Sequence, residues 1–297
     1  MAITAQMVKE LREKTGVGMM DCKTALNETN GDMEAAIDWL RTKGLAKAAK
    51  KAGRVAVEGL IAIAGSGDRA AMIELNSETD FVARNEQFQT LAKSVAEAAL
   101  KTDGAVESVL QAPISAGRTV DAAVTAAVAT IGENMTLRRA AVLSVEGGIV
   151  ASYAHAAISP GLGKIGVIVG LKSTGDKTKL TALGRQLAMH VAAASPLAVD
   201  ASRIDPQTLA RERAIFAEQA RESGKPDAII EKMVEGRMRK FYEESTLLKQ
   251  AFIMDGERTV ETVLKDSAKD IGGDVTVTDF IVFRLGEGVQ REEAEAA

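Results

Sequence analysis

The feature that most constrains the fold is an internal repeat in the middle of the chain. At a constant spacing of 96 residues, segment 72–77 aligns with segment 168–173, and the helical pattern 91–98 aligns with 187–194. The agreement runs over 27 residues without a gap, so duplication explains it better than chance. Each copy has the pattern of a strand, a turn, a strand and a helix. We therefore predict an α+β core made of two copies of one unit, each with its helix on one face of a sheet.

The second copy has the longer hairpin loop. Residues 57–59 match residues 145–147 at a spacing of 88, which leaves about eight extra residues in the second hairpin, where 159–163 lie. Segment 161–166, with the sequence GLGKIG, matches the glycine pattern that binds dinucleotides. That chemistry needs a loop that opens a helix, whereas this segment leads into a strand. We therefore interpret it as an enlarged turn and disfavour a small-molecule enzyme that uses it.

Helical segments flank and interrupt this core. Three short apolar stripes before residue 53 predict a three-helix bundle, and a charged helical pair at 201–242 predicts an inserted antiparallel coiled-coil hairpin. The basic run from Lys43 to Arg54 is interpreted as a solvated helical linker, with contact to a phosphate or an acidic partner as the lesser alternative. The expected divisions are 1–53 (bundle), 54–145 (first core unit), 146–200 with 243–285 (second core unit), 201–242 (hairpin) and 286–297 (an acidic tail expected to be disordered).

Composition excludes several classes of protein. A net charge of −4 with 3% aromatic residues is unlike a general nucleic-acid binder. One cysteine, Cys22, rules out an intramolecular disulfide, and two histidines, His155 and His190, disfavour a histidine-based metal site. No run approaches about 18 apolar residues, and the charged first residues lack the pattern of a signal peptide. We expect a cytoplasmic protein with no cofactor, no metal, no direct nucleic-acid contact and no membrane span.

Segment 76–85 is the unusual connection of the first copy. It has the sequence NSETDFVARN, follows a strand, precedes a helix and places Phe81 and Val82 inside a polar stretch. One interpretation is an N-cap at Thr79 or Asp80 with the two apolar side chains tucked inward. The other is an apolar wedge presented beside an acid, which suits insertion into a partner protein. The residue pattern alone leaves both interpretations open.

Long motifs along the chain resemble those of the bacterial elongation factor Ts family. They are residues 8–26 (VKELREKTGVGMMDCKTAL), 78–85 (ETDFVARN), 131–135 (IGENM), 233–238 (MVEGRM) and 286–288 (GEG). The similarity covers nearly the whole chain. It implies a ubiquitin-associated-like N-terminal bundle followed by a duplicated α+β core with an inserted antiparallel coiled coil.

The resemblance also implies a function. Members of the family are guanine nucleotide exchange factors for the GTPase elongation factor Tu, so no catalytic residue is expected in this chain. A dimeric assembly with that partner is left open. The residues implied to contact the partner are Thr79, Asp80, Phe81 and Val82, near its Mg²⁺ and nucleotide site, together with Ile131, Gly132 and His155.

Two points stay open beside this resemblance. Family members often have a basic residue and Ile-Gly-Val soon after the histidine, whereas here a long loop separates His155 from Lys164. The alternative function is a non-catalytic binding scaffold, in which the ubiquitin-associated-like module tethers a partner without accelerating nucleotide exchange.

Overall fold

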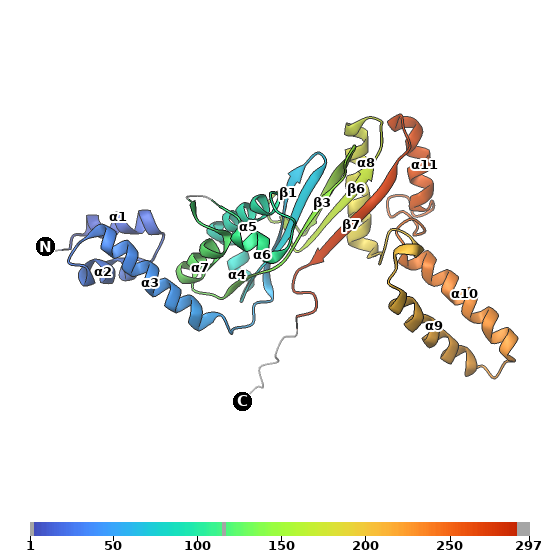
Figure 1. Cartoon of the computed structure of the whole chain (residues 1–297), viewed down its shortest axis with the longest axis horizontal. Helices are drawn as coiled ribbons and strands as arrows, with labels where there is room; N and C mark the ends of the chain where they lie inside the picture. Colours follow the sequence, from blue (N-terminus) through green and yellow to red (C-terminus); the bar gives the residue numbers. More distant parts are fainter. Residues whose placement is uncertain (1–2, 115–116, 290–297) are drawn as a thin grey trace.

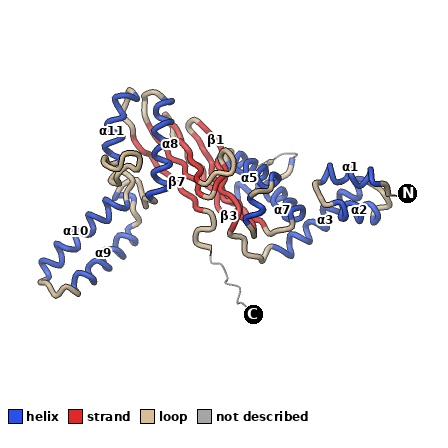
Figure 2. The backbone as a smooth tube through the Cα atoms, turned by 180° about the vertical axis from the view of Figure 1, so that it is seen from behind, coloured by secondary structure: helices blue, strands red, loops and turns tan. Residues whose placement is uncertain are grey.

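The computed structural model describes residues 3–114 and 117–289. Helices form both ends of an elongated molecule, and two antiparallel sheets lie between them (Figure 1, Figure 2). This mixture of helices and antiparallel sheets confirms the predicted α+β class. Within the described residues, no helix combines the length and the apolar character needed to cross a bilayer.

Three helices form the N-terminal bundle: α1 (Ala5–Thr15), α2 (Met19–Glu28) and α3 (Met33–Lys51). The Asp32 carboxylate caps α3, and Gly16 ends α1 with a left-handed φ of 70°. The apolar stripes meet in a small core that includes Leu11, Cys22, Leu26 and Leu40. Helix α3 continues past this core onto helix α7 (Val120–Ile131), where a Cβ added to Gly44 would lie 2.9 Å from the Cβ of Ala129.

The first core unit is a sheet with helices on one face. Its strands are β1 (Glu58–Ser66), β2 (Arg69–Ser77) and β3 (Met135–Ser144), in the order β3-β2-β1, with β5 (Leu162–Gly163) at the edge. Helix α5 (Glu86–Ala99) and helix α7 cover one face through a core that contains Phe88. The shorter helices of this unit are α4 (Asp80–Ala83) and α6 (Val106–Gln111).

The second core unit repeats this plan and packs against the first. Its sheet has the order β4-β6-β7, with β4 (Gly148–His155), β6 (Ile165–Lys172) and β7 (Thr276–Arg284), and its outer face is covered by α8 (Lys177–Ala194) and α11 (Val260–Ile271). The inner faces of the two sheets meet in an apolar layer that contains Ile61, Met72, Ile168 and Phe283. The core is therefore layered as helix, sheet, sheet, helix.

A helical hairpin interrupts the second unit. After a short 3₁₀ turn (Ala201–Arg203), α9 (Pro206–Arg221) and α10 (Asp227–Ser245) run back to back and project from the end of the molecule opposite the N-terminal bundle (Figure 1). They pack on each other through a narrow apolar seam built around Ala220, Val234 and Met238. This seam is small, so most of the hairpin surface is left to solvent.

The repeat extends further than the sequence pattern indicated. Helices α7 and α11, each followed by the third strand of its sheet, are related by a spacing of 140 residues. Each begins after a capping threonine, Thr119 or Thr259, and ends at a left-handed glycine, Gly132 or Gly272. Both sheets also carry a β-bulge at the equivalent place. Insertions of different lengths change the spacing from 96 to 140, which hides this second half of the repeat.

The enlarged hairpin loop of the second unit also contributes a short strand to the sheet of the first unit. Within it, β5 pairs with β1 of the first sheet, with Gly163 opposite Ile61 and Leu162 opposite Ala62. The Ile63 amide also donates to the Gly161 carbonyl at 2.8 Å. The extra residues therefore complete the edge of the other unit's sheet, and the glycine segment leads into a strand as predicted.

The segment expected to form an acidic tail divides into two parts. Residues 286–289 follow β7 and turn onto the first sheet, where Gly286 donates its amide hydrogen to Glu74 at 2.8 Å. Residues 290–297 lie outside the described part of the chain. The glycine-rich start of this segment is thus held by a charged partner that the local sequence does not reveal.

Candidate functional site

The loop after β2 presents Phe81 to solvent. Phe81 lies in the single turn of α4 with 75% of its surface exposed, whereas the neighbouring Val82 is 5% exposed. Successive residues of a helical turn point about 100° apart, so burying Val82 turns Phe81 away from the core. The hypothesis that both apolar side chains tuck inward is therefore wrong for Phe81 and holds for Val82.

A carboxylate clamp fixes the backbone of this loop. Glu133 accepts hydrogen bonds from the amide and the hydroxyl of Thr79, at 2.9 and 2.6 Å. In the opposite direction, Glu78 accepts the amide of Asn134 at 2.6 Å. The Ser77 hydroxyl adds a bond to the Thr79 carbonyl at 3.0 Å. The loop and segment 131–134 thus hold each other through charge-assisted bonds, so Phe81 stands on a rigid support.

The end of the basic run also contacts the Phe81 loop and segment 131–134. The Arg54 guanidinium group lies 3.5 Å from the Glu78 carboxylate. The backbone carbonyl of Arg54 accepts a hydrogen bond from the Asn134 side chain at 2.7 Å. The Lys51 ammonium group donates to the carbonyl of Gly132. Lys51 and Arg54 therefore bind the chain's own core, whereas Lys43, Lys47 and Lys50 stay exposed on α3, as the interpretation of the run as a solvated helical linker predicts.

The structure brings Ile131 and Gly132 beside the Phe81 loop. Gly132 ends α7 with a φ of 92°, and apart from its chain neighbours no atom of the described residues lies within 4 Å of a Cβ built on it. Ile131 is half-buried and lines a groove of about 430 Å³ between α5, α7 and the end of α1. Gly132 therefore offers an open backbone surface next to a groove lined by both polar and apolar side chains.

Asp80 lies beside Phe81 with half of its side chain exposed. Its nearest cation is Arg84, 3.8 Å away and 75% exposed. Such exposed pairs contribute little to stability, on the order of 0–1 kcal/mol, because water screens them. The fold makes little use of this carboxylate, which remains accessible to a partner.

His155 lies at the same end of the core as this loop. It is the last residue of β4, where it pairs with Ile165, while Ser77 at the end of β2 pairs with Glu58. Glu58 and Ile165 both line a cavity of about 350 Å³ between the two units. The exposed imidazole is oriented by Tyr153, whose hydroxyl lies 3.0 Å from Nδ1. The two units therefore each present one candidate contact residue at a shared end.

The other residues that drew attention in the sequence lie elsewhere and belong to the fold. Burial raises the pKa of the Cys22 thiol, which lies inside the N-terminal bundle. His190 is fully buried in α8, where its Nε2 lies 2.9 Å from Gln250 and its Nδ1 accepts the Ile253 amide at 3.3 Å. The described residues contain no group of three or more side chains that could hold a metal ion.

Sequence reasoning did not identify Glu133 and Asn134 as parts of the site. Both fall inside the motif 131–135, but nothing in their local pattern predicts bonds to residues more than 50 positions earlier. The only available signal was their polarity at the end of an alanine-rich helix. Their role follows from the packing of α7 against the loop, which is a tertiary feature.

The chain is similar in sequence to known proteins over its whole length. Residues 78–287 match the family model described as elongation factor TS, and this span includes the loop, the clamp and His155. Proteins named elongation factor Ts from Sinorhizobium fredii and Rhizobium meliloti are each 61% identical to the chain, over 100% of this chain and 97% of their own length. One from Brucella anthropi is 57% identical over the same shares. The chain therefore belongs to the elongation factor Ts family.

Proposed function

We propose that this chain is a guanine nucleotide exchange factor for elongation factor Tu in translation elongation. It would bind the GDP complex of that GTPase in the cytoplasm, disturb the Mg²⁺ and phosphate site with the Asp80–Phe81 loop, and so release GDP for replacement by GTP. Thr79 and Val82 would position that loop, and Ile131, Gly132 and His155 would make neighbouring contacts. The chain would break no covalent bond and would need no cofactor.

The observation that carries this proposal is Phe81, an aromatic side chain 75% exposed on a clamped loop. Exposing a large apolar ring costs roughly 1.5–3 kcal/mol of lost burial, so the fold itself has no use for this arrangement. A rigid support also lowers the entropy that a flexible loop would lose on binding. A fixed, exposed ring beside an accessible carboxylate is therefore suited to enter a partner as a wedge.

The mechanism follows from thermodynamic linkage. A protein that binds the nucleotide-free GTPase best must weaken nucleotide binding by the same factor by which nucleotide weakens its own binding. GDP is held by phosphate contacts, by Mg²⁺ and by ordered loops of the GTPase. Phe81 would displace partner elements that support these contacts, and the negative charge of Asp80 would disfavour the arrangement that holds the cation.

The test is release of a fluorescent GDP analogue from elongation factor Tu, with the chain present in substoichiometric amounts. The parent should accelerate release catalytically, and Phe81→Ala should slow the accelerated rate by about tenfold or more, as expected for a central aromatic contact. The matched control is Leu197→Ala, because Leu197 is another large apolar residue with 58% exposure but lies in the second unit, before the helical hairpin. A Phe81→Ala variant with the parent's rate would contradict the wedge.

Asp80 and His155 give smaller, separable tests. Asp80→Asn keeps the shape and removes the charge, so its loss of rate should shrink as Mg²⁺ is lowered. His155→Ala should reduce exchange by less than Phe81→Ala, because it removes a neighbouring contact and leaves the wedge in place. An effect of Asp80→Asn that does not change with Mg²⁺ would argue against the electrostatic role.

One observation favours a second candidate, the non-catalytic scaffold. Met19 and Met20, at the start of α2, are 60% and 74% exposed, and flexible methionine side chains are frequent at binding surfaces. A bundle with such a surface could tether a partner without acting on its nucleotide. Binding of elongation factor Tu without faster GDP release would favour this candidate over exchange.

A further inference from the structure

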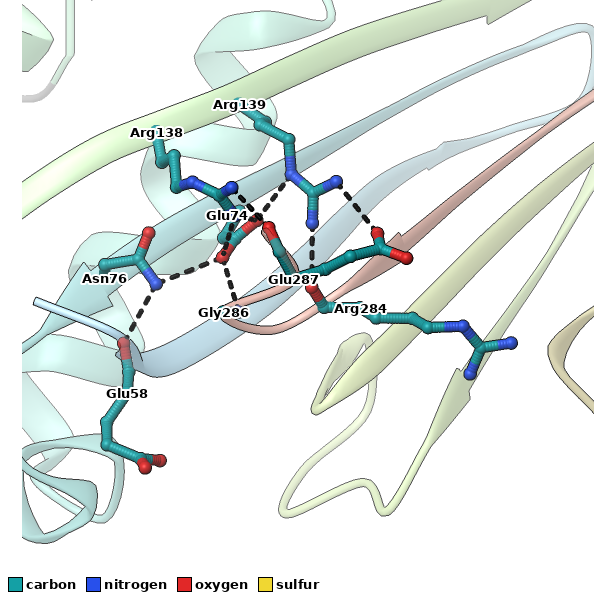
Figure 3. Close-up of polar contacts among 8 residues, drawn as sticks. All are labelled: Glu58, Glu74, Asn76, Arg138, Arg139, Arg284, Gly286 and Glu287. Atoms are coloured by element: carbon teal, nitrogen blue, oxygen red, sulfur yellow. Dashed lines mark hydrogen bonds and ion pairs between the residues drawn. The ribbon is translucent and has the colours of Figure 1, made fainter. Parts of the chain in front are cut away.

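One acidic residue is fully buried in the core. Glu74, in the middle of β2, has an exposure of 0%, which is costly for a carboxylate unless its charge is paired. Its two oxygens accept from Arg138 at 3.1 and 3.2 Å, from Arg139 at 2.6 Å, from Asn76 at 3.1 Å and from the Gly286 amide at 2.8 Å (Figure 3). The carboxylate is thus saturated by donors from three separate segments of the chain.

A β-bulge explains how two consecutive arginines reach one carboxylate. Arg139 pairs with Glu74 across the strands, the next pair joins Leu137 to Leu75, and Arg138 is the extra residue between them. A bulge places two residues opposite one and turns both toward the same side. The cluster is therefore built into the geometry of the sheet rather than collected from flexible side chains.

The repeat shows that the basic unit does not need this cluster. At the equivalent bulge of the second unit, Gly170 stands for Glu74, while Thr278 and Asp279 stand for the two arginines. A Cβ added to Gly170 would lie 2.4 Å from the Thr278 hydroxyl, so that unit has no room for an acid there. Since one copy folds without it, the charged cluster of the first copy serves something other than the shared fold.

The cluster captures the end of the second unit. At the end of β7, the Arg284 carbonyl accepts a hydrogen bond from Arg139 at 2.7 Å. Beyond the strand, the Glu287 carboxylate lies 3.2 Å from the same guanidinium (Figure 3). The Glu287 carbonyl accepts from Arg138. Gly286 is required at its position, because a Cβ there would lie 2.7 Å from the Val57 carbonyl at a φ of 71°. Residues 284–287 therefore form a strap from the second sheet to the first.

The strap lies between the two candidate contact residues. On one side, Arg284 of β7 pairs with Ile165 of β6, and Ile165 pairs with His155 of β4. His155 therefore lies two strands away from Arg284, at the same level of the sheet. On the other side, Asn76 joins Glu74 to the Glu58 carbonyl at 3.1 Å. Glu58 in turn pairs with Ser77, the residue from which the Phe81 loop begins.

We infer that Glu74 is a positioning residue: with Arg138, Arg139 and the strap, it fixes the Phe81 loop of the first unit relative to His155 of the second, so that both enter one partner together. When Phe81 and His155 belong to one rigid body, binding of one raises the effective concentration of the other at the partner. A looser junction between the two core units would lower that effective concentration. This inference rests on the proposed function.

The first experiment measures the joint without any exchange reaction. Spin labels on Arg84→Cys and Ala157→Cys, in a Cys22→Ala background, report the distance between the loop and the end of β4. The parent should give a narrow distance distribution, and Glu74→Gln should broaden it. Arg139→Gln is the second variant, since it removes the bonds to Glu74, Arg284 and Glu287 together. Unchanged distributions in both variants would overturn the inference.

A control separates positioning from loss of stability. Leu180→Ala removes a fully buried side chain from the core of the second unit, far from the strap in the sequence, and should lower the melting temperature without broadening the distribution. Equal broadening in Leu180→Ala and Glu74→Gln would reduce the role of Glu74 to general stability, which also contradicts the inference.

The second experiment asks whether Glu74 acts through the two contacts. In the GDP-release assay, Glu74→Gln should slow exchange by about threefold to tenfold, a range typical of coupled sites. When His155 is already alanine, there is no second contact to align, and the same substitution should cost less than about twofold. An equal loss in both backgrounds would overturn the inference. If instead Phe81→Ala leaves the parent rate unchanged, the proposed function fails, and the distance measurement still tests the joint.

Discussion

The two core units share their strands and helices but differ in the connection after the second strand. In the second unit, Asp176 caps α8, accepting from the amides of Thr178 and Lys179 at 2.7 and 3.1 Å. In the first unit, the equivalent Asp80 only pairs weakly with Arg84. There the helix is divided after α4, and Asn85 caps α5 instead. The same aspartate stabilises a helix in one copy and faces solvent in the other.

The residues around this connection also differ between the two units. The clamp residue Glu133 is replaced by Gly273 at the equivalent place, and Thr79 is replaced by Gly175. Gly175 packs so tightly that an added Cβ would lie 2.2 Å from the Ile271 carbonyl. The exposed Phe81 is replaced by an exposed Lys177. Both copies of the core unit have therefore kept the same packing of strands and helices. Only the first copy has a divided helix, the Glu133–Thr79 clamp and an exposed apolar side chain, Phe81.

The strongest way to break this comparison is to exchange the two tips. Phe81→Lys should reduce accelerated GDP release by about tenfold or more, because it replaces an apolar wedge by a charge. Adding Lys177→Phe should not restore the rate, since the second unit lacks the clamp. Lys177→Phe alone serves as the control and should exchange like the parent. Restoration in the double variant would mean that any exposed ring at this end of either helix suffices.

The next test concerns the helices before the third strands. Helix α7 presents Ala129 to Gly44 of α3, whereas the equivalent residue of α11 is Lys269. Ala129→Lys places a charged chain in a contact with no space, at a cost of about 1–3 kcal/mol, and should release α3 from the core. Small-angle scattering should then show a larger radius of gyration. Lys269→Ala, the reverse change, should leave the radius unaltered, and a compact Ala129→Lys variant would contradict this docking.

A smaller difference is expected between the two aspartates. Backbone hydrogen bonds from Lys179 and Thr178 lower the pKa of Asp176. Asp176→Ala should therefore lower the melting temperature by about 2–4 °C, the size expected for losing one cap in a protein of this length. Asp80→Ala should change it less. Because the folded pKa is the lower one, the stabilisation by Asp176 is present near neutral pH and is lost as the pH falls through the acid range. Equal shifts for both variants would remove the distinction.

The smallest effect appears only when the pH is changed. His190 corresponds to Ser94 of the first unit, and burial is the main cause that lowers its pKa below 6.5. Between the folded and unfolded pKa values, the unfolded chain binds the proton more readily. The contribution of His190 to stability should therefore be constant above about pH 6.5 and decline below it. Melting curves at pH 7.5 and 5.5 should show a shallower dependence in His190→Gln, and an identical slope would exclude His190 as its source.

How far the sequence predicted this structure depends on whether local signals were present. The α+β class followed from the internal repeat and from apolar periodicity. The equivalence of α7 and α11 did not, because their outer surfaces differ: α7 is alanine-rich where α3 covers it, and α11 is charged. Likewise, β5 looked like part of a turn, since its pairing partner β1 lies about a hundred residues earlier.

The site was predicted to a similar degree. The sequence alone could not decide whether Phe81 points inward, because its pattern fits a staple as well as a wedge. The decision depends on Val82 filling the core and on Glu133 holding Thr79, which are contacts between distant segments. The partners of Lys51 and Arg54 were missed for the same reason: they lie in the core, far from both residues in the sequence.

The buried carboxylate also has a consequence for the order in which the molecule assembles. Glu74 and Gly286 are 212 positions apart, so their bond closes a loop that contains most of both core units. Contacts at such separation form late in folding, because the chain between them must be ordered first. As the chain leaves the ribosome, Glu74 emerges long before its last donor. Attachment of the strap to Glu74 is thus a late step of folding. Local unfolding of the native protein should begin when the strap detaches from Glu74.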